Sequence, residues 1–294
     1  MTQSRSSLEG KICMVTGATS GLGEVTAREL AKRGATMVLV GRDRDKTEAV
    51  AQSIAADSGN GNVEWLLADL SSQEEIRRLA GEFRSEHETL DVLVNNAGAF
   101  FTEYGETVDG VERTFAVNHL NYFLLTNLLL GPLKAAAPSR VVNVASGAHK
   151  GAGINLEDPS LEGNYSGWRA YGQSKLANIM FTYELARRLE GTGVTANALH
   201  PGAVATNIGS NNKVWYARPV LALFRRFSTP PEKGARTSIY LASSPEVEGV
   251  SGGYFAEERP ASSSEASRDA VAARKLWELS ETLTGLSREP GAWG

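Results

Sequence analysis

The sequence is short of cysteine, of long apolar runs and of clustered basic residues, and each shortage excludes a class of protein. The one cysteine, Cys13, permits neither an intramolecular disulfide nor a thiolate metal cluster, which is typical of a reducing compartment. No stretch approaches the roughly 18 uninterrupted apolar residues that a membrane-spanning helix needs. The N-terminus MTQSRSSLEG is polar, unlike a signal peptide. We therefore expect a cytoplasmic protein without a transmembrane segment.

Charge and histidine content exclude two further classes. The 294 residues carry 30 Lys and Arg against 34 Asp and Glu, a net charge of -4, with no basic cluster, so no nucleic-acid partner is expected. The histidines are dispersed without ligand spacing on a helix, so no metal site is predicted. His119 and His200 stand beside motifs and are interpreted as packing or supporting residues. The four are His87, His119, His149 and His200.

Apolar stretches alternate with segments of helical periodicity along most of the chain. This order predicts an α/β fold with a doubly wound, Rossmann-type parallel sheet of about seven strands and helices on both faces, in a single domain over 1–294. The expected strands are 11–18, 36–42, 62–70, 90–98, 139–146, 194–202 and 251–262. The expected helices are 19–35, 43–59, 71–87, 111–137, 170–193 and 231–244.

Three irregular stretches interrupt this alternation, at 147–169, 203–232 and 258–269. The first two follow strands on the side where such sheets bind ligands, so we expect them to form the substrate pocket, with 203–232 as its lid. The third is rich in serine and opens what we interpret as a C-terminal tail, 257–294, after a core of about 8–256.

A glycine-rich turn, TGATSGLG, joins the first expected strand to the first helix. Glycine lets the backbone approach a pyrophosphate, and the amides of a helix N-terminus stabilise its charge. The alternative is that these glycines serve packing. At the first strand-to-helix turn of an alternating chain the pattern favours a dinucleotide site, with contacts from Gly17, Thr19, Ser20, Gly21, Leu22 and Gly23.

Several motifs together resemble the short-chain dehydrogenase/reductase family. They are TGATSGLG, NNAG at 95–98, Ser146, YGQSK at 171–175 and HPG at 200–202, in the family's order and spacing. The wording LDVLVNNAG, FAVNHL, RVVNVAS, AYGQSKLAN and TANALHPG is most similar to the retinol dehydrogenase group. The resemblance implies a cofactor site that also includes Asp69 and Leu70 at the adenine, Asn95, Ala97, Gly98 and Val117 near its ribose, and Pro201, Gly202, Val204 and Thr206 at the nicotinamide. Asp69 could equally cap the next helix.

The end of the second expected strand bears on which nicotinamide cofactor is bound. An acidic residue there would accept hydrogen bonds from the 2′-hydroxyl of NAD. The chain has Gly41 and then Arg42, whose guanidinium suits a 2′-phosphate for which Gly41 leaves room. A solvated surface arginine is the alternative, and Asp43 lies one residue beyond the expected acidic position. We predict NADP(H) in preference to NAD(H).

The catalytic residues follow from the chemistry of a carbonyl and a hydride. The oxygen needs a proton donor, or a base in the reverse reaction, and Tyr171 is expected to serve with its pKa lowered by the ammonium of Lys175 one helical turn beyond. Ser146 is expected to polarise the substrate oxygen. The resemblance implies that Lys175 also bonds the nicotinamide ribose, and that the main-chain carbonyl of Asn118 holds a water in a proton relay.

The substrate is addressed by the segment 213–227, which combines aromatic, leucine and basic residues. It suggests either an apolar lid for a lipophilic carbonyl or alcohol, with peripheral membrane contact possible, or a helix covering the sheet. We predict an NADP-dependent alcohol dehydrogenase or carbonyl reductase. The alternatives are a ketoreductase of polar secondary metabolites and a catalytically silent NADP-binding regulator. The resemblance implies a homo-oligomer through the helices that include 119–136 and YGQSK.

Overall fold

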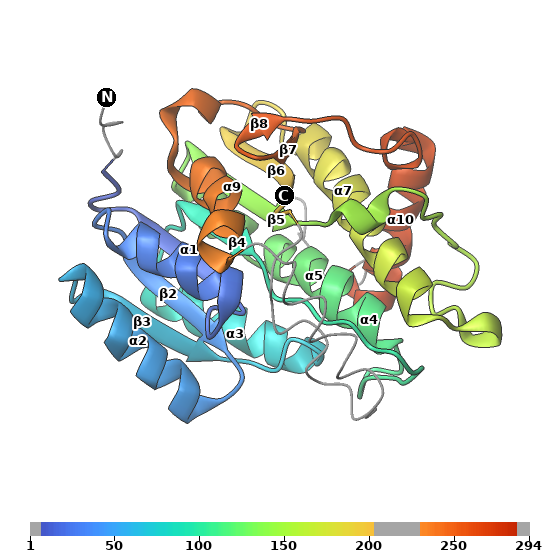
Figure 1. Cartoon of the computed structure of the whole chain (residues 1–294), viewed down its shortest axis with the longest axis horizontal. Helices are drawn as coiled ribbons and strands as arrows, with labels where there is room; N and C mark the ends of the chain where they lie inside the picture. Colours follow the sequence, from blue (N-terminus) through green and yellow to red (C-terminus); the bar gives the residue numbers. More distant parts are fainter. Residues whose placement is uncertain (1–6, 203–229, 287–294) are drawn as a thin grey trace.

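The computed structural model describes residues 7–202 and 230–286. Within them a single sheet has the strand order β3-β2-β1-β4-β5-β6-β7-β8 (Figure 1). The strands from β1 to β7 pair in parallel, and β8 adds a short antiparallel edge. This confirms the predicted doubly wound fold. The bounds are β1 Ile12–Thr16, β2 Thr36–Gly41, β3 Val63–Leu67, β4 Val92–Asn95, β5 Ser139–Val144, β6 Val194–His200, β7 Tyr254–Ala256 and β8 Arg259–Pro260.

Helices cover both faces of this sheet (Figure 1). Alternate strand residues point to opposite faces, so Cys13 packs with α1, α2 and α9, while its neighbour Met14 packs with α3, α5 and α7. The helices are α1 Gly21–Ala31, α2 Arg44–Ser58, α3 Gln73–Glu86, α4 Arg113–Phe115, α5 Asn121–Leu128, α6 Leu130–Ala135, α7 Gly167–Arg188, α9 Pro231–Ser243 and α10 Ala270–Thr284. The uninterrupted apolar strands therefore reflect burial on two sides.

The expected helix over 111–137 is broken into pieces. A π-helical turn, η1 Ala116–Leu120, separates α4 from α5, and in it the amide of Asn121 bonds to the carbonyl of Ala116, five residues earlier. A second break separates α5 from α6 at Leu129. Pro132 accounts for it, because its ring clashes with the carbonyl four residues earlier and ends α5.

The segment that we interpreted as a tail contains a packed helix. α10 begins after Asp269, whose carboxylate caps the amides of Val271 and Ala272, and it lies along α7 (Figure 1). Its Trp277 is buried, with ring centroids 4.8 Å from Phe123 and 5.7 Å from Phe181. The serine-rich stretch before α10 suggested a tail. The apolar face of α10 becomes evident only where it packs against α7.

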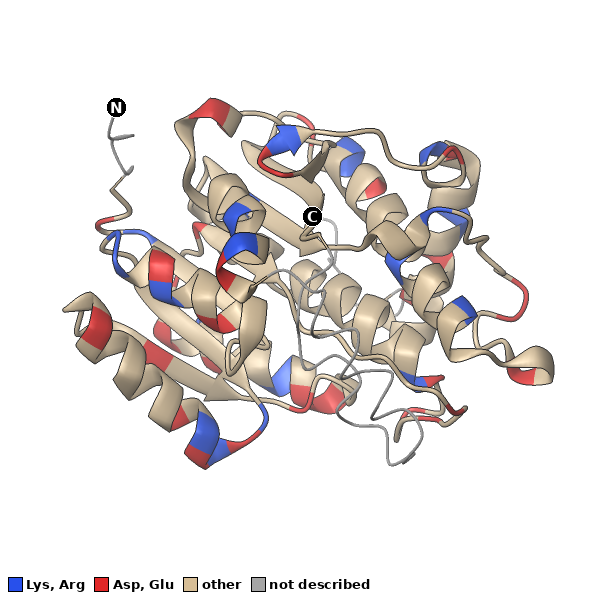
Figure 2. Cartoon of the chain, viewed as in Figure 1, with Lys and Arg blue, Asp and Glu red and all other residues tan. Residues whose placement is uncertain are grey.

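Charges of both signs are interspersed over the described ribbons, whereas α5 carries none (Figure 2). Within residues 7–202 and 230–286 no helix is long and apolar enough to span a bilayer.

Candidate active site

The candidate site lies at the carboxyl ends of β1 and β4, where the strand order reverses and doubly wound sheets bind ligands. Thr16 and Asn96 join these two strands. The hydroxyl of Thr16 accepts from the amides of Asn96 at 2.9 Å and Ala97 at 3.1 Å, and the Asn96 side chain donates to the carbonyl of Thr16 at 2.8 Å. Neither residue was predicted as a site residue, although Thr16 belongs to TGATSGLG and Asn96 to NNAG, from which neighbouring residues were predicted.

The glycine-rich turn is built for close approach of the backbone. Gly17 has a φ of 64°, and a Cβ there would lie 2.9 Å from the Cα of Ala97. A Cβ on Gly23 would overlap the carbonyl oxygen of Gly17. These glycines therefore allow close packing, which was the alternative interpretation of the motif. The turn that they form leads directly into α1 at Gly21.

The first turn of α1 begins at Gly21, directly after the glycine-rich turn. Its N-cap, Ser20, makes no side-chain capping hydrogen bond, and Thr19 beside it is half-buried. Leu22 is buried and packs against Ala235 and Ile239 of α9, so its side chain serves the core. Such a helix start suits an anionic group.

Gly41, at the end of β2, has a different role from the expected one of leaving room for a 2′-phosphate. A Cβ on Gly41 would overlap the hydroxyl of Thr47 and lie 2.7 Å from the Cγ2 of Thr19. Packing, rather than room for a phosphate, therefore requires the glycine. Asp43 is the N-cap of α2 and accepts from the amide of Lys46 at 2.9 Å, which gives its carboxylate a structural task. Arg42 is exposed directly beyond β2.

The residues assigned to the adenosine differ in exposure. Asp69 is exposed near the start of the loop after β3, where its carboxylate accepts from the amide and hydroxyl of Ser71, and Leu70 follows it half-buried. Ser72, not Asp69, caps α3 by accepting from the amide of Glu75. Asn95 is fully buried, and its amide donates to Thr126 at 2.9 Å and Asn143 at 2.8 Å, so its side chain points into the core.

Further along the same loop the chain returns to the centre of the site. Ala97 and Gly98 are half-buried. A Cβ on Gly98 would lie 3.4 Å from the Nζ of Lys175 and 3.2 Å from the Oδ1 of Asn118. Val117 is half-buried next to Asn118 in η1. The NNAG stretch and the YGQSK helix therefore meet.

Tyr171 and Ser146 lie together. Ser146 follows β5 and begins a short 3-10 turn, where its hydroxyl accepts from the amide of Ala148 at 3.2 Å. Burial raises the pKa of Tyr171, and a hydrogen bond with Ser146 partly opposes that rise. The expected lowering of the tyrosine pKa by the lysine is not the net effect here, because desolvation of the phenolate is the larger influence.

Lys175 is buried between two phenol rings. Its side chain is 3% exposed, its Nζ donates to the carbonyl of Val144 at 3.0 Å, and the rings of Tyr122 and Tyr171 lie 5.7 and 5.8 Å away. Burial lowers its pKa from 10.5 to about 7. An ionisable group with so displaced a pKa is typical of a functional site.

Asn118 ties the loop after β4 to α7. Its side chain accepts from the amide of Ala99 at 2.7 Å and donates to the Ala99 carbonyl at 2.9 Å and to the hydroxyl of Ser174 at 3.0 Å. Ser174 in turn donates to the carbonyl of Tyr171 at 2.8 Å. The side chain of Asn118 thus fixes the two segments that carry Gly98 and Tyr171.

The end of β6 contributes the last described part of the site. His200 accepts from the amide of Gly147 at 3.0 Å and so fixes the turn after Ser146. Pro201 and Gly202 follow, the latter with a φ of 83°. Val204, Thr206 and the segment 213–227 lie outside the described residues.

Aromatic side chains lie beside Tyr171. The ring of Phe100 is 5.7 Å from that of Tyr171 in an edge-on arrangement, and Trp168 lies 4.8 Å from Phe100 on its other side. Trp168 is 67% exposed although it is a large apolar residue. A half-buried Phe100 and an exposed Trp168 beside buried polar groups are typical of a ligand-binding surface.

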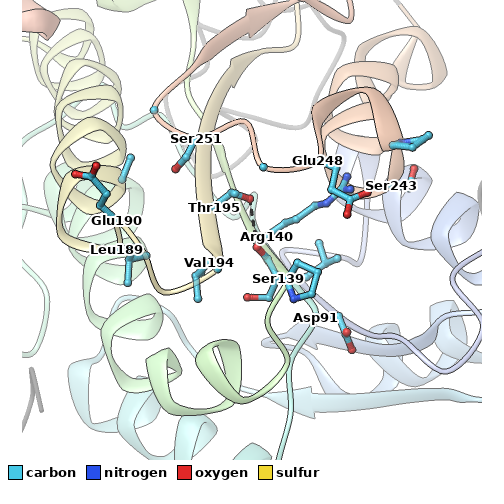
Figure 3. A pocket seen from close by; sticks show the side chains of 18 of the residues that line it. Asp91, Ser139, Arg140, Leu189, Glu190, Val194, Thr195, Ser243, Glu248 and Ser251 are labelled. Atoms are coloured by element: carbon cyan, nitrogen blue, oxygen red, sulfur yellow. Dashed lines mark hydrogen bonds between the residues drawn. The ribbon is translucent and has the colours of Figure 1, made fainter.

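A large cavity of about 1080 Å³ occurs at the opposite end of the sheet (Figure 3). It is lined by residues at the amino ends of the strands, among them Asp91, Ser139 and Val194. Asp91 is paired with Lys11 at 2.8 Å, and Arg140 donates to the carbonyls of Leu241 and Ser244. The carboxyl ends, where the displaced pKa values and the glycine-rich turn converge, are the better candidate for chemistry.

The histidines in the part of the chain that the structure describes do not gather into a cluster of metal-ligating groups. No group of three or more His, Cys, Asp or Glu that could hold a metal occurs among those residues. His87 pairs with Glu64, and His149 lies 2.7 Å from the carbonyl of Ser146. Cys13 is fully buried in the core, and burial raises the pKa of its thiol.

Known proteins resemble this chain over most of its length. A family model described as short chain dehydrogenase matches residues 11–217. Retinol dehydrogenase 14 of Mus musculus is 47% identical over 292 residues, with 95% of this chain and 87% of the relative covered. Retinol dehydrogenase 11 of Homo sapiens is 44% identical over 279 residues, with 95% and 87% covered.

Solved structures also resemble this chain over most of its length. A putative uncharacterized protein from Mycobacterium paratuberculosis has a TM-score of 0.78 at 39% identity, with 96% of both chains covered. The RhlG/NADP active-site complex of Pseudomonas aeruginosa has a TM-score of 0.66 at 27% identity, with 85% of this chain and 95% of that chain covered.

Proposed function

The chain belongs to the short-chain dehydrogenase family, and we propose that it interconverts a lipophilic alcohol and its aldehyde or ketone with NADP(H). It is an oxidoreductase that acts on the CH–OH or carbonyl group, with retinol dehydrogenases among its relatives. The observation that carries the proposal is the buried Lys175 with its displaced pKa, next to a Tyr171 that is hydrogen-bonded to Ser146.

The described residues fit a nicotinamide dinucleotide. Gly17 in the left-handed conformation and the start of α1 at Gly21 present backbone amides to an anionic group. The cofactor, when bound, supplies or accepts a hydride. Arg42 is our candidate for the 2′-phosphate, supported by its place after β2 and by the use of Asp43 as a helix cap. The NADP complex of RhlG is a further, weaker support.

The side chains of the site have separable tasks in carbonyl reduction. Because burial raises its pKa, Tyr171 stays protonated near neutral pH and can donate its hydroxyl proton to the substrate oxygen. Ser146 holds the phenol and polarises the same oxygen. Lys175, with a pKa of about 7, can exchange a proton with its surroundings near neutral pH. The carbonyl of Asn118 is our candidate for the relay that replenishes it.

The aromatic pair Phe100 and Trp168 supports a lipophilic substrate. Trp168 exposes 67% of its surface next to the ring that contacts Tyr171. An apolar substrate would cover this surface and gain about 25 cal/mol for each Å² removed from water. A polar ketone would gain less there, which is why we place the ketoreductase of polar metabolites second.

A carbonyl screen with NADPH and NADH tests the activity. We expect turnover of apolar aldehydes such as nonanal and all-trans-retinal, and a fall of roughly 10²–10⁴-fold in kcat for Tyr171→Phe. Turnover confined to polar ketones would favour the ketoreductase. NADPH binding without any turnover that depends on Tyr171 would establish the silent regulator instead.

The cofactor preference has its own test. Arg42→Ala should weaken NADPH binding about tenfold, as loss of one charge-assisted contact at an exposed site would, while NADH binding stays unchanged. Arg44→Ala is the matched control, because Arg44 is also exposed but lies over the ring of Trp65 at 5.2 Å. An Arg42→Ala variant with unaltered NADPH affinity would remove the phosphate assignment.

Oligomeric state and location remain predictions. Part of the α7 surface assigned to a homo-oligomer contact packs against α10 of the same chain, so any such contact would use the surface that α10 leaves uncovered. Light scattering after size exclusion, and localisation of a tagged chain, would test the homo-oligomer and the cytoplasmic location.

A further inference from the structure

Four buried polar residues from three elements form a continuous chain of hydrogen bonds. The hydroxyl of Ser280 on α10 lies 3.0 Å from the Nε2 of His119 in η1, and the Nδ1 of His119 lies 3.3 Å from the Oδ1 of Asn178 on α7. The Nδ2 of Asn178 donates to the main-chain carbonyl of Asn118 at 2.9 Å. All four residues are 0% exposed.

The amide of Asn178 fixes the direction of this chain. Since its Nδ2 donates to Asn118, its Oδ1 faces His119 and must accept a hydrogen bond from the N–H group at Nδ1. Burial lowers the pKa of His119 to about 4, so the ring is neutral and its Nε2 can only accept. The Ser280 hydroxyl lies 2.7 Å from the carbonyl of Leu276 as well as 3.0 Å from Nε2. Because Nε2 has no other donor among the described residues, we assign the hydroxyl proton to Nε2. Every donor therefore points towards the carbonyl of Asn118, an arrangement in which each bond strengthens the next.

The chain ends at a carbonyl in the π-helical turn. A π-turn widens the helix, and single π-turns occur frequently at functional sites. The side chain of Asn118 holds the carbonyl and amide of Ala99 next to Gly98, and it also bonds Ser174 on the YGQSK helix. A displacement of Asn118 would therefore shift the loop that contains Gly98 and the helix that contains Lys175.

We propose that α10 is part of the positioning machinery of the active site, because Ser280 orients the Asn118 carbonyl through His119 and Asn178. The inference rests on the proposed function for its catalytic consequence. Ser280 stands 161 positions from His119 in the sequence. A segment that was interpreted as a tail is therefore connected to the active site through hydrogen bonds. Ser280, His119 and Asn178 are positioning residues, since each acts through Asn118.

Ser280→Ala removes the first donor of the chain, and Thr284→Val is its matched control. Thr284 is also buried on α10, but its hydroxyl donates to the carbonyl of Ser280, within the same helix. With nonanal and NADPH as probes, we expect Ser280→Ala to lower kcat about fivefold without changing KM for NADPH. Thr284→Val should alter kcat by less than about twofold. Equal effects of the two variants would overturn the proposal.

A double-mutant cycle separates positioning from general destabilisation. Asn178→Ala interrupts the chain between His119 and Asn118, so adding Ser280→Ala to it should lower kcat no further. If the two residues merely support the fold, their effects on kcat will multiply. Multiplication of the effects would therefore refute the coupling.

Amide hydrogen exchange keeps the inference distinct from the proposed activity. If the wild-type protein turns over no carbonyl, the activity proposal fails while the coupling can still be measured in the η1 amides, 116–120. Faster exchange there in Ser280→Ala than in Thr284→Val supports the coupling. Equal exchange in the two variants contradicts it.

Discussion

Replacement of Lys175 by methionine tests the electrostatics of the site most directly. Methionine has a similar length and no charge, so Lys175→Met removes the cost of burying an ammonium that is 3% exposed. The lysine pKa is about 7 in the folded chain, against 10.5 as its ordinary value. The unfolded chain therefore binds more protons between these two pH values, and the free energy of unfolding of the wild-type protein rises with pH in that window.

The magnitude follows from the displaced pKa. Each pH unit inside the window changes the free energy of unfolding by about 1.4 kcal/mol, so the rise from pH 7 to pH 8.5 amounts to about 2 kcal/mol. Lys175→Met lacks this contribution. We expect the variant to be the more stable protein at pH 7, with an advantage that shrinks by about 2 kcal/mol at pH 8.5.

Urea unfolding followed by circular dichroism at several pH values measures this difference. Lys233→Met is the control, because Lys233 is exposed on α9, and its advantage over the wild type should not vary with pH. A Lys175→Met advantage that is constant from pH 7 to pH 8.5 would refute the reasoning about burial. The same variant should lose turnover, which shows that the destabilising lysine is retained for the reaction.

Two further substitutions test packing. Trp277→Ala should lower the free energy of unfolding by about 3–5 kcal/mol in urea titrations, because it empties the space against which Phe123 and Phe181 pack; a loss below about 1 kcal/mol would mean that α10 is not part of the core. Gly23→Ala should abolish NADPH binding in a fluorescence titration, because the added methyl overlaps the Gly17 carbonyl, and unaltered binding would contradict the geometry of that turn.

Strand and helix order could be predicted because burial leaves a strong pattern. A strand such as β5, enclosed by helices on both sides, has apolar residues at the successive positions Val141 and Val142, and the end of β5 at Val144 places Ser146 at the ligand edge. Tyr171 and Lys175 could be paired because helical geometry puts i and i+4 on one face. The approach of Lys175 to Gly98 was not predicted, because it joins segments far apart in the sequence.

Other features depend on contacts between segments far apart in the sequence. The π-turn at Asn118 depends on partners at Ala99 and Ser174, which no local pattern reveals. The direction of the Tyr171 pKa shift required the depth of burial, which raises the pKa and is only partly opposed by the hydrogen bond with Ser146. α10 was missed because its apolar residues form a face only when α7 lies against them.

Packing at the end of β2 restricts how the cofactor preference could evolve. An acidic side chain at position 41 would overlap Thr47 in α2 and press on Thr19 of the glycine-rich turn. A single substitution there would damage the turn before it created a new hydrogen bond to a ribose. A descendant that gained an acidic residue at position 41 would first need smaller residues at positions 19 and 47, so the packing of Thr19 and Thr47 limits which residues can stand at the end of β2.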